Sequence, residues 1–408
     1  MTSDPSPVPR SGRFPKAHRP FFLAACLYAA AAVPLWWAEW AGLLPGCDGC
    51  DPVARHAHEM LLGFAGAVLG GYLFTKVTLP RLLLALAAWA AARIGAWAGI
   101  GGAPGVVLAL AYPVLLFAFG GWPFLKAAKF GHNMVFAPTI AAFAVAEGLY
   151  QAGRLGLIEG GQRRGVLTAL DLVALLILVM GGRVIPAAMA GLVRKEENRE
   201  LFDRNRPWLE RVVVLGMALN AIGDMLALPR VLAMAVAGAA ALVRQGRWRP
   251  MQALTDPSMG PIQTGYFLLA TGLILASLSE QVGIGPGTDA LHLATIGGIG
   301  LVTSAMMLRI DHIRERRGHG WPKMGIPIAV LLVVAADLRI TATVAPEVLI
   351  PASMALWSAA YLMLAIMLVL GWLRPTSHVW TAPALQGDSD VILPRSGAVM
   401  CPACLRGT

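Results

Sequence analysis

Apolar runs of about 20 residues recur along almost the whole chain and are separated by short polar connections. A helix of that length crosses the roughly 30 Å hydrocarbon core of a bilayer, and in lipid it satisfies its own backbone hydrogen bonds. Hydrophobic residues make up 57% of the chain and charged residues 14%, which excludes a water-soluble domain of ordinary composition. The sequence therefore predicts an all-α, polytopic membrane protein.

The apolar runs and their Gly, Pro and charged breakers predict about twelve transmembrane helices in one bundle. The expected spans are 21–44, 52–75, 82–100, 104–125, 132–153, 165–185, 208–228, 230–243, 260–281, 288–309, 324–343 and 350–373. They form a domain over 21–374, in which two halves are joined by the charged connection 190–208. A segment 1–20 precedes this domain, and a tail 375–408 follows it.

The net charge of +10 is spread over short basic runs between the apolar segments, not over one face, so nucleic acid is not an expected partner. If the N-terminus lies inside, most Lys and Arg residues fall in connections on the inner side. The positive-inside rule therefore predicts that both termini are cytoplasmic. Membrane lipid is the expected neighbour of the outward helix faces.

One polar stretch interrupts this apolar pattern, at the entrance to the expected span 52–75. It contains His56, His58 and Glu59 within four residues. Ionisable side chains at such positions are costly in lipid, and they usually mark functional sites. We therefore take these three residues as the first candidates for binding a metal or haem.

The predicted orientation brings further polar side chains to the same depth. At 1.5 Å per residue, His56 and His58 lie about 6 to 9 Å below the outer boundary, and His292 lies at about 6 Å. Arg93 and Arg339, on spans that run the other way, fall in the outer half as well. Two imidazoles from different helices can ligate a haem iron, and arginines can pair with its propionates.

His56 and His58 point about 200° apart on a helix, so we do not expect them to ligate one iron together. One can bind haem while the other binds copper or supports a ligand, and Glu59 can orient either of them. A proton or substrate path through the same polar layer remains the alternative. Either path can include a buried acid, and Glu147 and Asp224 are available.

A second polar cluster lies on the expected cytoplasmic side. Its members are Lys129, His132, Asn133, Arg183, Arg309 and His312. Binding of anionic lipid headgroups is the preferred interpretation, and a second anion or cofactor site is the alternative. The glycine pair and the proline of segment 181–186 favour that alternative, because they predict a helix break at Arg183.

The five cysteines do not predict a zinc ribbon, although four of them form C-x-x-C pairs. Cys47 and Cys50 are expected outside, as a local disulfide or a surface copper site. Cys401 and Cys404 are expected inside, so the two pairs cannot meet.

Three motifs in this order make the sequence similar to the NnrS family. The first is His56-Ala57-His58-Glu59-Met60, and the second is Gly181-Gly182-Arg183-Val184-Ile185-Pro186. The third begins with Leu291-His292, continues to Gly300 and is followed by Met306-Met307-Leu308-Arg309. The resemblance implies a twelve-helix protein of the bacterial inner membrane that contains haem and copper and takes part in nitric oxide metabolism and resistance to nitrosative stress. It implies functional roles for the motif residues His56, His58, Glu59, Arg183, His292 and Arg309.

The chain departs from the family pattern in two places. The family's Gly-His-Thr-Gly-Arg element is displaced here to the stretch 311–320, and a histidine expected late in the fifth span is replaced near Glu147. An accessory site can therefore differ in this chain. A terminal oxidase of the haem-copper type is disfavoured, because spans 165–185 and 208–228 contain no histidine for its copper site.

The sequence thus predicts a haem b protein of the nitric oxide response, with copper as a second candidate metal. Its expected partners are nitric oxide or a related small ligand and a quinol or other electron donor. A role in defence or electron transfer is favoured over turnover. Two other classes remain open: a transporter of a metal, haem or small anion, and a quinol-dependent reductase of a small oxidant.

Overall fold

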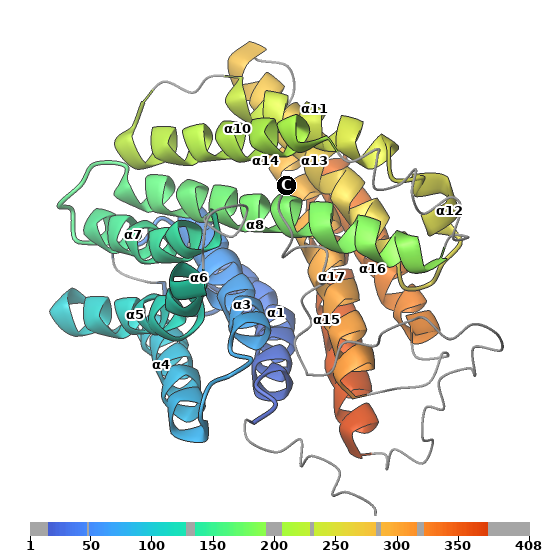
Figure 1. The fold of residues 1–408 in the computed structure, drawn as a ribbon. Coiled ribbons are helices and arrows are strands. Elements are labelled where there is room, and N and C mark those ends of the chain that lie inside the picture. The colour runs from blue at the N-terminus through green and yellow to red at the C-terminus, as the bar shows by residue number, and fades with distance from the viewer. Residues whose placement is uncertain are drawn as a thin grey trace, which may run out of the picture.

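The structure, a computed structural model, describes residues 15–46, 49–127, 135–192, 206–228, 232–282, 287–315 and 322–373. Every regular element in these ranges is a helix (Figure 1), so the all-α prediction is confirmed there. Several predictions lie outside the described residues. They concern segment 1–14, positions 193–205 of the connection, the tail from 374, Cys47, Cys401 and Cys404, and Lys129, His132 and Asn133 of the inner cluster.

The first half of the chain forms helices that are mostly joined by short turns. They are α1 (His18–Trp40), α2 (Pro52–His58), η1 (Glu59–Phe64), α3 (Ala65–Leu73), α4 (Leu79–Trp97), α5 (Gly102–Leu116), η2 (Phe117–Gly121), α6 (Trp122–Ala127), α7 (Phe136–Arg154) and α8 (Gly161–Leu192). The elements η1 and η2 are π-helical, and each continues directly from the α-helix before it into the one after it.

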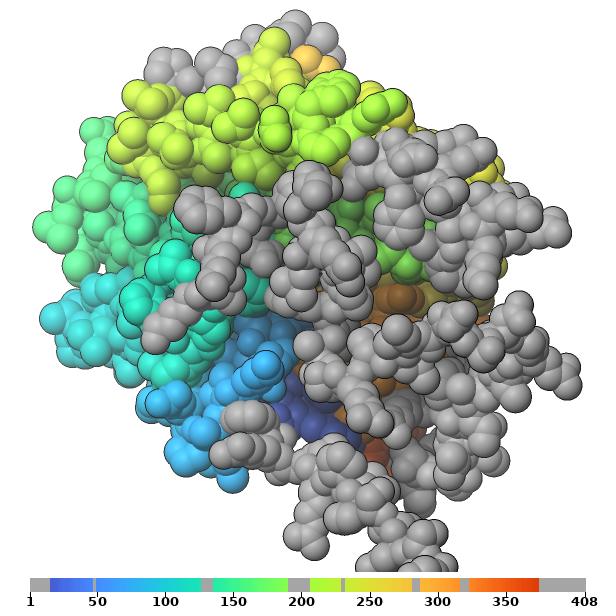
Figure 2. Space-filling model, viewed as in Figure 1, coloured from blue at the N-terminus to red at the C-terminus, as the bar shows by residue number. Residues whose placement is uncertain are grey.

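The second half follows the same pattern. Its elements are α10 (Pro207–Leu226), α11 (Ala233–Gly246), α12 (Pro250–Leu254), α13 (Gly260–Val282), α14 (Gly287–His292), the π-helix η4 (Leu293–Gly300), α15 (Leu301–Arg314), the short 3₁₀ helix η5 (Pro322–Gly325), α16 (Ile326–Ile340) and α17 (Pro346–Leu373). In Figures 1 and 2 the yellow-green helices α10 and α11 lie across one edge of the molecule.

The structure confirms a polytopic membrane protein and corrects the predicted number of spans. Among the described residues, seven helical segments are long and apolar enough to cross a bilayer. They are His18–Trp40, Leu79–Trp97, Gly102–Leu125, Gly161–Met189, Gly260–Glu280, Gly287–Arg314 and Pro346–Leu373. A count near seven therefore replaces the predicted twelve.

The other five predicted spans are helical, but they lack the length or the hydropathy of a membrane-crossing helix, for two physical reasons. Helices α11 and α16 have 14 and 15 residues, which is too short for the full hydrocarbon thickness. The run from α2 to α3, helix α7 and helix α10 are longer, but they carry polar side chains such as His58, Glu147 and Asp224. These polar side chains lower the hydropathy on which a span is recognised.

The first and last helices of the described chain pack side by side, which joins the two halves. Trp357 of α17 donates a hydrogen bond from Nε1 to the backbone oxygen of Ala29 in α1, at 3.0 Å. Phe64 of η1 meets the ring of Tyr361 edge to face, with centroids 5.0 Å apart. Helix α8 packs between α7 and α10, and α13 packs against α11 and η4.

Helix α8 runs without interruption through segment 181–186, so the predicted helix break at Arg183 is wrong. The glycines of this segment make room for other side chains instead. A Cβ on Gly181 would lie 2.7 Å from the ring of Tyr266, and one on Gly182 would lie 2.5 Å from the guanidinium of Arg244. The glycine pair is therefore explained by close helix packing.

The position of η4 depends on a similar close approach to α13. A Cβ added at Gly272 would lie 2.5 Å from the backbone nitrogen of Ala294. Backbone atoms cannot rotate away as a side chain can, so any larger residue must push η4 off α13. The sequence Leu293–Gly300 directly follows His292, so this contact also positions that histidine.

We predict that Gly272→Ala lowers the free energy of unfolding by about 2 kcal/mol or more, because the added methyl group overpacks a backbone contact. The measurement is the melting temperature of the purified protein in detergent. Gly223→Ala in α10 is the matched control, since its Cβ would meet nothing within 4 Å. The control should be neutral or stabilising by roughly 0.5 to 1 kcal/mol. Equal melting temperatures for the two variants would contradict this account.

Candidate functional site

Both helices that carry the outer histidines change from α to π geometry directly after a histidine. Helix α2 ends at His58 and η1 begins at Glu59, while α14 ends at His292 and η4 begins at Leu293. At the start of α2, the Asp51 carboxylate accepts a hydrogen bond from the Val53 backbone at 3.0 Å. A π-helical turn changes the direction of the side chains that follow it, and such turns are frequent at functional sites.

The structure brings together the histidines that the sequence placed at one depth on separate helices. The imidazole rings of His56 and His292 have centroids 6.4 Å apart and planes inclined by only 17°. Trp36 of α1 also packs against this pair, with its ring centroid 4.5 Å from that of His56. His56 and His292 are both half-buried.

The ring nitrogens of this pair are available for a metal. His56 Nδ1 is buried and has no hydrogen-bond partner among the described residues. His292 Nδ1 lies 2.7 Å from the backbone oxygen of Thr288, an arrangement that leaves Nε2 as the ligand atom. Two imidazoles on opposite sides of one metal, each bonded at about 2 Å, have ring centres roughly 6 Å apart. The residues therefore fit a metal held between them.

Arg339 and Asp289 form an ion pair beside the two histidines. The Nη1 atom of Arg339 lies 2.7 Å from Oδ1 of Asp289, which precedes His292 by one helical turn. Arg339 also interacts electrostatically with both imidazoles. The predicted proximity of Arg339 to the histidines is thus seen, although its guanidinium is already paired.

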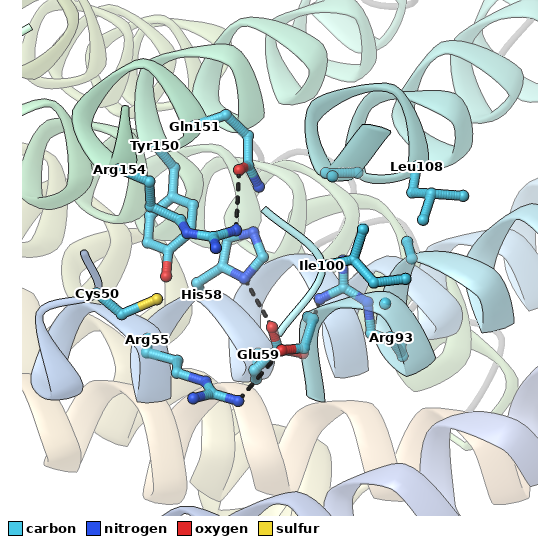
Figure 3. A pocket seen from close by; sticks show the side chains of 15 residues that line it. Cys50, Arg55, His58, Glu59, Arg93, Ile100, Leu108, Tyr150, Gln151 and Arg154 are labelled. Carbon is cyan, nitrogen blue, oxygen red and sulfur yellow. Dashed lines mark hydrogen bonds and ion pairs between the residues drawn. The ribbon is translucent and has the colours of Figure 1, made fainter. Parts of the chain in front are cut away.

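His58 lies in a different, fully buried environment between two carboxylates. Its Nδ1 is 2.9 Å from Oε1 of Glu59, and its Nε2 is 3.0 Å from both oxygens of Glu147. The ring stacks on Tyr150 with centroids 3.9 Å apart. Figure 3 shows His58 beside Glu59, with Tyr150 and Gln151 approaching from α7. Both nitrogens are occupied, so His58 can ligate a metal only if one carboxylate contact breaks.

The same network extends to a third and a fourth helix. Arg93 of α4 donates to Oε2 of Glu59 at 2.8 Å, and the hydroxyl of Tyr28 in α1 donates to the same oxygen. The Tyr28 hydroxyl in turn accepts from Nε1 of Trp97 at 3.0 Å. Arg93 is therefore held by a protein carboxylate in this structure. The prediction that it pairs with a haem propionate stays a prediction.

The proton count of this network follows from its geometry. A neutral imidazole donates from only one nitrogen, yet both nitrogens of His58 face carboxylate oxygens. The cluster accordingly holds one additional proton, on His58 or on a carboxyl group. With that proton, the positive charges of His58 and Arg93 balance the negative charges of Glu59 and Glu147. Such balance is what a buried charge cluster requires.

A small cavity adjoins this network, between α2, α4, α5 and α7 (Figure 3). Its polar lining includes His58, Glu59, Arg93, Gln151 and Arg154. It has room for about one water molecule, so it does not accommodate a haem. The cavity and the histidine pair are therefore separate features of the same end of the bundle.

Arg183 and Arg309 of the predicted inner cluster have other partners. Arg183 lies over the ring of Phe136 at 4.9 Å and approaches Glu210 at 3.6 Å. Arg309 donates to the hydroxyl of Ser258 at 3.0 Å. The structure thus links each arginine to a different neighbouring helix or loop, and their predicted cofactor-binding roles stay predictions.

Sequence reasoning missed the partnership between Glu147 and His58. It recognised Glu147 as a buried acid, and as the position near which the family resemblance expects a histidine. The signal that could have joined the two is their matched depth on antiparallel spans. Depth alone does not give the rotation of each helix, so the contact was not predicted.

Together, the helical bundle, the paired imidazoles and the buried charge network define a polytopic membrane protein with polar groups buried inside its helical bundle. The chain matches the family model described as NnrS protein over residues 13–375, and it belongs to the NnrS family, which is linked to the nitric oxide response. A comparison with curated proteins found no match.

We predict that Glu147→Gln lowers the free energy of unfolding by about 3 to 5 kcal/mol, because it removes one partner of a buried, hydrogen-bonded charged pair. The readout is the melting temperature in detergent. Glu280→Gln is the control, since that carboxylate pairs with Arg163 at 3.5 Å near the surface, and an exposed pair contributes at most about 1 kcal/mol. A Glu147→Gln protein as stable as the control would show that the cluster does not depend on this charge.

Proposed function

We propose that this NnrS family protein binds one haem b through His56 and His292 and acts in the defence against nitric oxide. The observation that carries the proposal is the geometry of the two imidazoles, 6.4 Å apart and nearly parallel, with one buried nitrogen unpartnered among the described residues. The proposed ligand is nitric oxide or a related small molecule. Electrons would come from a quinol or another donor.

The residues of the site have distinct roles in this proposal. His56 and His292 would hold the haem iron through one ring nitrogen each, and the Thr288 carbonyl fixes the orientation of the His292 ring. Trp36 limits the movement of His56 by packing against its ring, with the two ring planes inclined by 38°. Arg339, beside both rings, is the candidate partner for a propionate. When bound, haem would supply one-electron redox chemistry and the capacity to bind a diatomic ligand.

Copper has a less direct place in the proposal. The donor pair His56 and His292 also suits copper, since imidazole is a common ligand for that metal. His58 is the other candidate ligand, but it must first release Glu59 or Glu147. Glu59 then serves to orient His58, not to hold the cofactor directly. Quantifying copper and haem on one sample separates these assignments.

The proposed location is the bacterial inner membrane, with the histidine pair near its outer face. Support comes from Cys50, which is disulfide-bonded and lines the cavity beside His58. Disulfides persist outside the reducing cytosol. The end of the bundle that holds Cys50, His56 and His292 is therefore assigned to the outer side. The domain 21–374 and the cytoplasmic location of both termini form part of the same proposal.

We predict that the detergent-purified protein shows the absorption bands of a six-coordinate haem b after reduction with dithionite. His56→Ala and His292→Ala should each lose these bands or convert them to a five-coordinate spectrum, because each removes one proposed ligand of the iron. The measurement is the spectrum of oxidised and reduced samples, with copper determined on the same preparation.

His312→Ala is the matched control, because this histidine lies near the other end of α15 and outside the pair. Its spectrum should equal that of the wild type. An unchanged spectrum in His56→Ala and His292→Ala would reject the ligand assignment. If the wild-type protein contains copper but no haem, the site is assigned to copper and the haem proposal is rejected.

A further inference from the structure

A second group of metal-ligating side chains lies at the opposite end of α1 and α15 from the histidine pair. His18 begins α1, and Asp311 and Glu315 lie at the end of α15 and just after it. One ligand atom from each of the three lies within 4.8 Å of the others. Since the 23 residues of α1 span about 35 Å, this group is well separated from His56 and His292.

All three side chains are removed from water. The exposed fractions are 1% for His18, 0% for Asp311 and 6% for Glu315. Burying two carboxylates and an imidazole together is costly unless cations or hydrogen bonds compensate. The cations and hydrogen bonds that offset the cost of burying these three side chains therefore indicate what the group does.

The contact between His18 and Glu315 is close but is not a hydrogen bond. His18 Nε2 lies 3.2 Å from Oε1 of Glu315, yet this buried nitrogen has no hydrogen-bond partner among the described residues. The nitrogen and the oxygen are thus neighbours without pointing at one another. Ligands on adjacent positions of one metal ion, each bonded at about 2.0 to 2.2 Å, have this relationship.

The carboxylates are oriented by other side chains, as metal-bound carboxylates usually are. Trp372 of α17 donates to Oδ1 of Asp311 at 2.7 Å. Glu315 accepts from Lys16 at 2.7 Å and from Nε and Nη2 of Arg19 at 2.9 and 2.6 Å. The Lys16 side chain is 52% exposed, so its ammonium can exchange this contact for water when another cation binds.

We propose that His18, Asp311 and Glu315 form a binding site for one divalent transition-metal ion. One imidazole and two carboxylates are a donor set that zinc accepts, and three protein ligands leave a position for water. The imidazole favours a transition metal over magnesium or calcium, which prefer oxygen ligands alone. The ion would fasten the start of α1 to the end of α15. This site is independent of the proposed haem.

The test is zinc binding to the tag-free, full-length protein in detergent after removal of metals by chelation and dialysis. Isothermal titration should detect this site in the wild type and equally in the His56→Ala/His292→Ala double variant. His18→Gln and Asp311→Asn should each weaken it at least tenfold. His312→Gln, a neighbouring histidine outside the group, should leave it unchanged.

A second measurement separates a metal site from a purely structural ion-pair cluster. Zinc should raise the melting temperature of the wild type but not that of Asp311→Asn, because a ligand stabilises only the state that binds it. Lys16→Gln should bind zinc more tightly, since it removes a competing positive charge from Glu315. The proposal is overturned if the wild type binds no zinc, if Asp311→Asn binds it as the wild type does, or if magnesium binds equally well.

Discussion

The balanced burial of His58, Glu59, Glu147 and Arg93 is the interaction on which the first half of the bundle depends. These groups come from α2, η1, α7 and α4, and the Tyr28 hydroxyl adds α1 to the same network. Charges inside a bilayer are tolerated when they neutralise each other and form hydrogen bonds. Each of these helices must therefore keep its depth and rotation. The network thereby holds in place the helix α2, which also carries His56.

The π-helical turns connect this constraint to the candidate cofactor site. His56 and His58 lie on one short helix, but one ring faces His292 while the other faces Glu147. The change to π geometry at Glu59 and again at Leu293 allows the histidine turns to adopt rotations that differ from those of the helices below them. One stretch of sequence thus contributes to two sites with different chemistry.

The packing of α1 against α17 joins the first and last helices of the described part of the chain. The hydrogen bond between Trp357 and Ala29 lies partway along α1, between the histidine pair and the His18 group. Trp372 and Lys16 then complete the surroundings of Asp311 and Glu315 from opposite ends of the sequence. A helix pair that is distant in sequence therefore supports polar groups at both ends of the molecule.

The sequence by itself determined the helical class, the membrane location and the presence of a polar layer, because these depend on local hydrophobicity and on where ionisable residues interrupt it. It also placed His56 near His292 through depth alone. Hydropathy overstated the number of spans, since helices such as α11 are apolar but short.

Only the tertiary structure decided which partner each polar side chain takes. Arg93 pairs with Glu59, Gly182 makes room for Arg244, and His18 meets Glu315 across 297 positions of sequence. Such pairings depend on the rotation of each helix about its axis and on the packing of helices distant in sequence. Neither quantity is encoded in the depth or periodicity of a single span.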